Sequence, residues 1–214
     1  MLESYIDLLH RQRYGALATF SEALPGFPFA SVIPYAPDDR HGPVFFVSGL
    51  AEHTRNLLQN PKASLLLFDT GEPDVLAAPR ATIVGTVEPV LRDDSLERHY
   101  LRYQPAAERY LGLPDFRFFR LRPERVRWVA GFGRMGWLAG SEIEALGEPP
   151  DTLTEAAILA AQPKAPAGIR LLGMDRLGID YERNGQRARE TFGSTANSPD
   201  DMAAGLHHWL ASLR

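Results

Sequence analysis

The sequence contains no cysteine and no long apolar run. The absence of cysteine excludes disulfides, thiolate ligation of haem or of iron–sulfur clusters, and a cysteine nucleophile. A membrane helix needs about 18 consecutive apolar residues, so we expect no membrane partner and a cytoplasmic location. A net charge of −4 and a pI near 5.9 offer no basic surface for nucleic acid.

The composition is that of a globular protein, with 44% hydrophobic and 23% charged residues, and 214 residues suffice for one full domain and a smaller one. In the first part, short strands alternate irregularly with helices, which favours a barrel over a Rossmann sheet. The expected helices are 2–13, 52–59, 93–103 and 106–111, and the expected strands are 15–20, 29–35, 43–48, 63–68, 81–90, 116–122 and 125–131.

A domain boundary is expected within residues 140–166, where Gly, Pro and Ala accumulate, giving domains 1–140 and 141–214. The second domain is predicted to be a small α/β module with a three-strand antiparallel meander. Asn184-Gly185 predicts a hairpin turn, because both of its central residues need positive φ. Ser198-Pro199 predicts the start of a closing helix over 199–213. The predicted strands of the meander are 168–174, 177–182 and 186–192.

Several polar side chains follow the strand that ends at Ser48 and open the next helix. Hydroxyl, imidazole, guanidinium and amide groups at one helix N-terminus suit a phosphate dianion, because unpaired N–H groups and the helix dipole both favour negative charge. The alternative is that the hydroxyl and amide groups only cap the helix while the arginine is solvated. The candidate phosphate ligands are Ser48, His53, Thr54, Arg55 and Asn56.

The pattern Ser-x-Leu-Ala-x-His-Thr-x-Asn-Leu at 48–57, followed by Asn60-Pro61, carries a resemblance to a known family. It resembles the FMN-binding split barrels of the pyridoxamine 5'-phosphate oxidase-like superfamily, and looks closest to the haem-utilisation branch. The resemblance implies a mainly β protein with helices (α+β), in which a split β-barrel precedes a small α/β domain. It also implies a homodimer with cofactor sites at the subunit interface.

The resemblance further implies where a cofactor would lie. The FMN phosphate would lie near His53–Asn56, and the flavin ring along the backbone of Ser31, Val32 and Ile33. In haem-utilisation relatives, an arginine at the position of Arg80 is expected to face the haem propionates. The basic residues with which the oxidases hold FMN are replaced here by Ala51-Glu52-His53, and the strand at Ser31 lacks them as well.

Two further segments leave alternatives open. Gly131–Trp137 predicts either an aromatic pocket, lined by Phe132 and Trp137, or a tight turn between domains. His207 and His208 lie on a predicted amphipathic helix and either ligate haem or are solvated. Asp38–His41 is typical of a turn, so we expect no metal site.

The sequence therefore predicts an FMN-binding protein of oxidoreductase type with an unknown substrate. The phosphate-reading motif of true pyridoxamine phosphate oxidases is missing, and no catalytic residue is predicted. Two alternatives belong to other classes: a haem-binding or haem-utilisation protein, and a dimeric interaction module without a cofactor.

Overall fold

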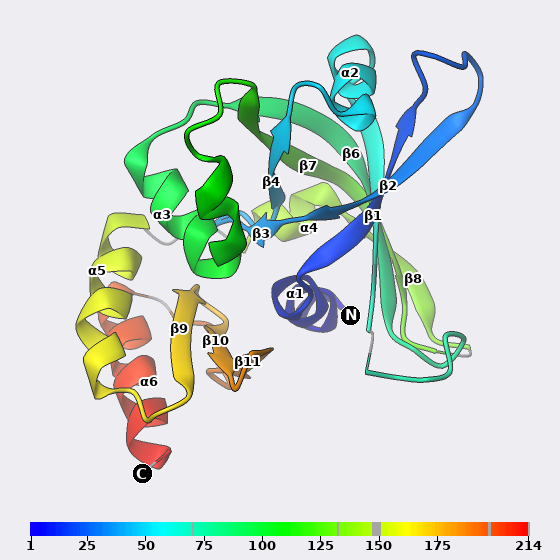
Figure 1. The fold of residues 1–214 in the computed structure, drawn as a ribbon. Helices are drawn as coiled ribbons and strands as arrows, with labels where there is room; N and C mark the ends of the chain where they lie inside the picture. Colours follow the sequence, from blue (N-terminus) through cyan, green and yellow to red (C-terminus); the bar gives the residue numbers. More distant parts are fainter. Residues whose placement is uncertain (70, 132, 147–150, 197, 214) are drawn as a thin grey trace. The chain divides into compact units, whose positions relative to one another are not determined.

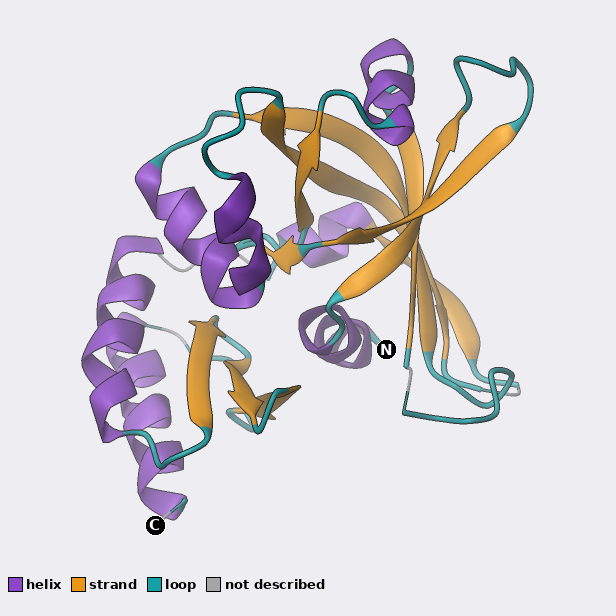
Figure 2. Ribbon diagram, viewed as in Figure 1, coloured by secondary structure: helices purple, strands orange, loops and turns teal. Residues whose placement is uncertain are grey.

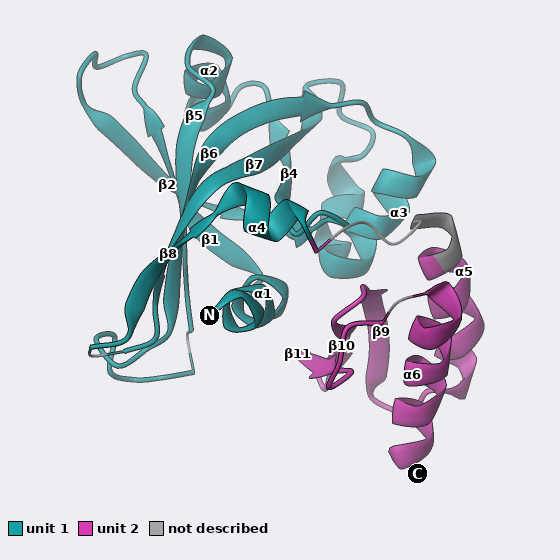
Figure 3. Ribbon diagram, turned by 180° about the vertical axis from the view of Figure 1, so that it is seen from behind, with its two compact units in different colours: residues 1–145 teal, residues 146–214 magenta. Residues whose placement is uncertain are grey.

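The structure, a computed structural model, describes residues 1–69, 71–131, 133–146, 151–196 and 198–213. It divides into two compact units, unit 1 (Met1–Ala145) and unit 2 (Leu146–Arg214), shown in Figure 3. The fold is α+β as predicted, with a curled antiparallel half-barrel sheet in unit 1 and a separate three-strand antiparallel sheet in unit 2. Within the described residues, every helix is too short or too polar to span a membrane.

Unit 1 is built on one sheet with the strand order β2-β1-β5-β6-β7-β4-β3, and β8 pairs with the outer part of β7. All of these pairs are antiparallel. The strands are β1 (Tyr14–Phe20), β2 (Pro28–Pro34), β3 (Ala36–Pro37), β4 (Pro43–Ser48), β5 (Lys62–Phe68), β6 (Arg80–Val90), β7 (Phe116–Val129) and β8 (Met135–Ala139).

The sheet curls without closing through its backbone, and a side chain spans the gap. The hydroxyl group of Tyr100 accepts a hydrogen bond from Phe46 N on β4 (3.3 Å) and donates one to Pro34 O on β2 (3.4 Å). Tyr100 is fully buried, so this link lies inside the half-barrel. The barrel expected from the sequence is thus split between β2 and β4.

Alternation along the strands separates a buried inner face from an exposed outer face. On β5, Ala63, Leu65 and Leu67 are buried, whereas the intervening Ser64, Leu66 and Phe68 face outward. The helices of unit 1 lie around this sheet, with α2 near one end of the half-barrel and the β5–β6 loop at the other (Figure 1). They are α1 (Leu2–Arg11), α2 (Glu52–Gln59), α3 (Asp94–Tyr103), the 3-10 helix η1 (Pro105–Tyr110) and α4 (Gly140–Glu144).

Strand β7 differs from the sequence prediction, because the two strands expected at 116–122 and 125–131 are one strand. Pro123 lacks an N–H group and would interrupt a regular ladder. The register shifts between Val84 and Gly85 of β6, and this irregularity lets β7 continue past Pro123. The segment after Gly131 contains β8, which the glycine-rich sequence did not indicate.

Unit 2 packs two helices on one face of its sheet, which has the order β11-β10-β9 (Figure 2). Apolar side chains of both helices and of the sheet form its core, with Trp209 against Tyr181 at 4.6 Å between ring centroids. The elements are α5 (Asp151–Ala161), the 3-10 helix η2 (Gln162–Lys164), β9 (Ile169–Met174), β10 (Gly178–Arg183), β11 (Gln186–Thr191) and α6 (Pro199–Ser212).

The turn and cap predictions for unit 2 are confirmed. Asn184 and Gly185 have φ values of 49° and 81°, as their hairpin turn requires. The Ser198 side chain accepts a hydrogen bond from Asp201 N and so caps α6.

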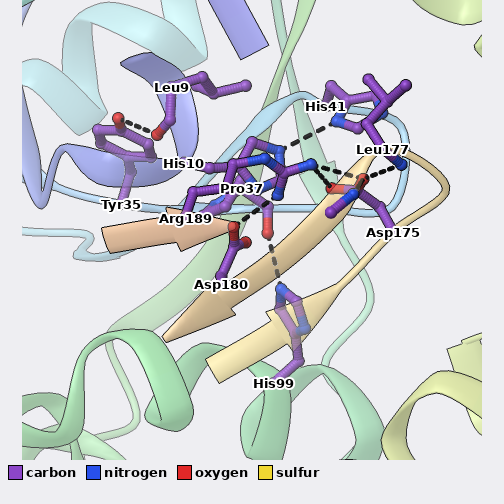
Figure 4. Close-up of polar contacts among 11 residues, drawn as sticks. Leu9, His10, Tyr35, Pro37, His41, His99, Asp175, Leu177, Asp180 and Arg189 are labelled. Atoms are coloured by element: carbon purple, nitrogen blue, oxygen red, sulfur yellow. Dashed lines mark hydrogen bonds and ion pairs between the residues drawn. The ribbon is translucent and has the colours of Figure 1, made fainter. Parts of the chain in front are cut away.

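A fully buried ion triad lies within unit 2 (Figure 4). The Arg189 guanidinium donates to Asp180 Oδ1 (2.5 Å) and to both carboxylate oxygens of Asp175 (2.6 and 2.8 Å). Burial alone would lower the pKa of Arg189, but the carboxylates of Asp180 and Asp175 outweigh it and raise that pKa. Arg189 therefore stays charged inside the unit.

Candidate functional site

Ser48 ends β4, and its hydroxyl group is committed to a carboxylate. Ser48 Oγ donates to Asp115 Oδ2 at 2.5 Å and accepts a hydrogen bond from Leu50 N at 3.0 Å. An anion thus already lies at the position that the sequence assigned to a phosphate. Asp115 was missed by sequence reasoning, because it is distant from Ser48 in the chain and no local pattern links them.

Thr54 and Asn56 are buried and hydrogen-bonded within unit 1. The Thr54 hydroxyl donates to Ser48 O (2.7 Å), which ties the first turn of α2 to β4. The Asn56 side chain donates to Thr19 Oγ1 (2.9 Å) and accepts from Glu22 N (2.8 Å), which fixes α2 to β1 and the turn after it. Both side chains therefore fix α2 to neighbouring segments, and neither forms the helix cap expected in the alternative, because the N-cap residue of α2 is Ala51 and no side chain caps it.

His53 points from α2 toward Ser31 on β2, so the structure brings together two residues predicted for the same site. His53 Nδ1 and Ser31 Oγ lie 3.2 Å apart in a hydrogen bond whose direction depends on the imidazole tautomer. His53 Nε2 is buried and has no hydrogen-bond partner among the described residues. Burial lowers the pKa of His53, so the imidazole is neutral at neutral pH.

The charges around the start of α2 do not favour a dianion. Arg55 is exposed, and its guanidinium donates to Leu50 O at 2.7 Å. Two carboxylates lie at the same site as Arg55. One belongs to Glu52, in the first turn of α2, and the other to Asp115. With a neutral His53, carboxylates outnumber cations at this site. A flavin phosphate would meet repulsion here, so these residues do not fit FMN as the oxidase pattern would.

Arg80 lies apart from the α2 site. It pairs with Phe68 at the far end of β5, six residues from Lys62 at the α2 end, which is about 20 Å at 3.3 Å per residue. Its guanidinium donates to Val75 O (3.1 Å), Leu76 O (3.3 Å) and Ala78 O (3.3 Å). Arg80 thus closes the loop between β5 and β6.

Strand β2 ends the hydrogen-bonded order of the sheet, with β1 as its backbone partner. Every second N–H and C=O group of an edge strand points away from its neighbour. The backbone contacts predicted for Ser31–Ile33 are therefore geometrically open. The side chains divide between the faces, since Ile33 is buried and Val32 is 69% exposed on the outer face.

One row of directly paired residues crosses the outer face of unit 1. It is called the outer row below. Its exposed apolar members lie on β2, β5 and β8, and an arginine on β7 is paired with the member on β8. The outer row is Val32, Ala16, Leu66, Thr82, Arg127 and Trp137.

Trp137 is the aromatic centre of this face. The guanidinium carbons of Arg125 and Arg127 lie 4.9 and 5.6 Å from the centroid of the Trp137 ring system. Trp137 is 46% exposed, so a planar group could still reach it. The sequence singled out Trp137 but not the two arginines, which only the β7–β8 pairing brings beside it. Phe132, predicted for the same pocket, lies outside the described residues.

His207 and His208 on α6 are exposed, in agreement with the interpretation that they are solvated. His208 lines a cavity of about 460 Å³ in unit 2, together with Trp209, Phe192 and several hydroxyl-bearing and acidic side chains. In unit 1, His99 Nε2 is hydrogen-bonded to Pro37 O at 2.7 Å.

A curled half-barrel sheet with a helix after β4 is the architecture of split-barrel proteins. The sequence profile of the family described as pyridoxamine 5'-phosphate oxidase matches residues 1–130. The chain belongs to this family. Membership confirms the superfamily inferred from the motif at 48–57.

The relatives are haem proteins by name. The chloroplastic heme oxygenase HOZ of Arabidopsis thaliana is 37% identical over 132 residues, 61% of this chain and 40% of that protein. The chain thus spans less than half the length of HOZ. The heme oxygenase HutZ of Vibrio cholerae is 28% identical over 140 residues, 62% of this chain and 79% of that protein.

A solved structure resembles the chain over almost its whole length. The heme binding protein from Mycobacterium smegmatis has a TM-score of 0.62 and 28% identity, covering 99% of this chain and 96% of that one. The names of these relatives agree with the haem-utilisation branch that the motif at 48–57 resembles.

Proposed function

We propose that this protein binds haem on the outer face of unit 1. The observation that carries the proposal is the exposed Trp137 between Arg125 and Arg127. A porphyrin needs an apolar or aromatic surface for its ring and cations for its propionates, and this group offers both. The names of the relatives support the same cofactor.

In this proposal, each side chain has a separate task. Trp137 contacts the macrocycle and excludes water from it. Arg125 and Arg127 pair with the propionates, since guanidinium groups bind carboxylates in bidentate fashion. Bound haem would supply a redox-active iron. The FMN-binding oxidoreductase predicted from the sequence stays a prediction, and the carboxylates around Ser48 would oppose the FMN phosphate.

A hemin titration followed by the Soret band tests the proposal. We expect saturable binding by the wild type and at least tenfold weaker binding by Arg125→Gln/Arg127→Gln. Arg122→Gln is the matched control, because Arg122 is exposed on the same strand but pairs with Glu144. Equal affinity in all three proteins would remove the site. Parallel titrations of His53→Gln, His207→Gln and His208→Gln identify any axial imidazole.

The same spectra separate the alternatives. Flavin bands that persist after incubation with FMN would favour the predicted oxidoreductase over haem binding. No spectral change with either cofactor would favour the dimeric interaction module.

We also propose that a second copy of the chain covers the outer face at Val32 and Leu66, beside the haem site at Trp137. Exposed apolar side chains rarely cluster on a monomer without a partner, and Val32 (69%), Leu66 (37%) and Trp137 (46%) all lie in the outer row. The six residues of the row extend over about 24 Å at 4.8 Å per strand spacing, wide enough for a two-fold interface. Light scattering should give a dimer for the wild type and a monomer for Val32→Asp/Leu66→Asp. A wild-type monomer would contradict this.

A further inference from the structure

Two histidines of unit 1 face each other in a buried position that none of the preceding sites uses. His10 Nε2, from the last turn of α1, lies 3.0 Å from His41 Nδ1, in the loop between β3 and β4 (Figure 4). The two side chains are 4% and 2% exposed. The planes of the two rings are tilted by 57°, so the ring edges that carry the nitrogen atoms approach each other and the ring faces do not stack.

The loop that carries His41 is held firmly. Asp38 Oδ1 accepts hydrogen bonds from Arg40 N (2.9 Å) and Gly42 N (2.7 Å), and Asp38 O accepts one from His41 N (3.1 Å). The second carboxylate oxygen of Asp38 pairs with Arg120 on β7. These bonds connect the loop to the sheet, so the backbone position of His41 is fixed.

His41 itself adopts a φ of 55°, in the left-handed region. This conformation costs an ordinary L-residue about 1–2 kcal/mol, whereas a glycine would adopt it freely. The loop thus presents an imidazole where a glycine would be less strained. Such strained residues cluster at ligand sites.

We propose that His10 and His41 are two ligands of a divalent transition-metal ion. A metal–nitrogen bond is about 2.0–2.1 Å long, so two nitrogens 3.0 Å apart subtend about 94° at a shared ion. That is the angle between adjacent ligands of octahedral or square-planar ions, and a tetrahedral zinc would need the nitrogens only a few tenths of an ångström further apart.

The donor set defines the class of ion. Neutral imidazole nitrogen suits Zn²⁺, Ni²⁺, Cu²⁺ or Co²⁺, whereas Mg²⁺ and Ca²⁺ require oxygen ligands. Both imidazoles are buried away from bulk water. They are therefore favoured over water molecules as ligands of the ion. The two histidines are 31 residues apart, so no metal-binding motif can be recognised in the sequence. The site does not depend on haem binding.

Calorimetric titration of the EDTA-treated 214-residue chain with ZnCl₂ and NiCl₂ tests the proposal. We expect the wild type to bind one ion that His10→Gln and His41→Gln each bind at least tenfold more weakly. His99→Gln is the matched control from the same unit. His207→Gln/His208→Gln removes the exposed pair of α6, at which ions could bind adventitiously.

A second measurement needs no variant and so does not depend on the folding of one. Zn²⁺ added to uniformly ¹⁵N-labelled wild type should shift His10 Nε2 and His41 Nδ1 in imidazole spectra, and leave His99 unshifted. Unshifted nitrogens in both rings, or binding lost only in the His207/His208 variant, would overturn the proposal.

Discussion

Replacing Arg189 by methionine should destabilise unit 2 by about 3–5 kcal/mol, because it removes the cation that the buried carboxylates of Asp175 and Asp180 share. Arg189, Asp175 and Asp180 are all nearly inaccessible, with side chains 1–5% exposed. Removing one partner of such a buried pair costs about 3–5 kcal/mol. A unit of roughly 70 residues has a total stability of about 3.5–10 kcal/mol. The folded-to-unfolded ratio should therefore fall about 10²- to 10³·⁵-fold.

Urea unfolding of Arg189→Met, followed by tryptophan fluorescence, measures this loss. Trp209 is the one tryptophan of unit 2, so Trp128→Phe/Trp137→Phe is the background in which it reports on that unit alone. A midpoint shift with unchanged slope gives the change in free energy of unfolding.

The neighbouring pair Arg170–Glu182 is the matched control, because it joins strands of the same sheet but is 38% and 16% exposed. Arg170→Met should cost less than about 1 kcal/mol. Adding Asp175→Asn and Asp180→Asn to Arg189→Met should recover part of the loss, since no uncompensated charge remains. A loss below 1 kcal/mol for Arg189→Met, or one equal to the control, would refute the reasoning.

Three further changes test unit 1 by urea unfolding. Tyr5→Phe should leave stability unchanged or raise it by about 1 kcal/mol, because the buried Tyr5 hydroxyl has no partner among the described residues; a clear loss would contradict this. Gly85→Ala should lower the free energy of unfolding by about 1–3 kcal/mol, because the alanine Cβ would lie 2.0 Å from Arg122 O. An unchanged free energy of unfolding would show that the backbone of β7 moves to make room for it. Burial lowers the pKa of His53 in the folded protein. Its contribution to stability is therefore fully present above about pH 6.5, the ordinary pKa of histidine, and is lost as the pH falls below that value, because the unfolded chain takes up the proton first. His53→Gln should therefore flatten the pH dependence between 7.5 and 5.5, and an identical slope in both proteins would oppose this.

Local signals in the sequence sufficed for most of the secondary structure. Alternation fixed β5, the Asn184-Gly185 pair fixed the β10–β11 hairpin, and Ser198 fixed the start of α6. Each of these depends on residues adjacent in the chain. The motif at 48–57 correctly indicated the family for the same reason.

The contacts that shape the candidate sites were not predictable, because they join distant segments. Nothing near Ser48 indicates that Asp115 will accept a hydrogen bond from its hydroxyl group. Arg125 and Arg127 reach Trp137 only because β8, hidden in a glycine-rich segment, pairs with β7. Arg80 satisfies carbonyl groups of its own loop, a role that its place before a strand does not reveal.

The pairing of β4 with β7 bears on synthesis of the protein. Val44–Val47 are buried apolar residues whose partners, from Arg117 to Arg120, leave the ribosome about seventy residues later. At about 5–20 residues per second, this strand waits roughly 4–14 s without its partner. During that interval, its apolar side chains are accessible to chaperones and to other nascent chains. The aggregation risk of this protein thus concentrates in the time before β7 emerges.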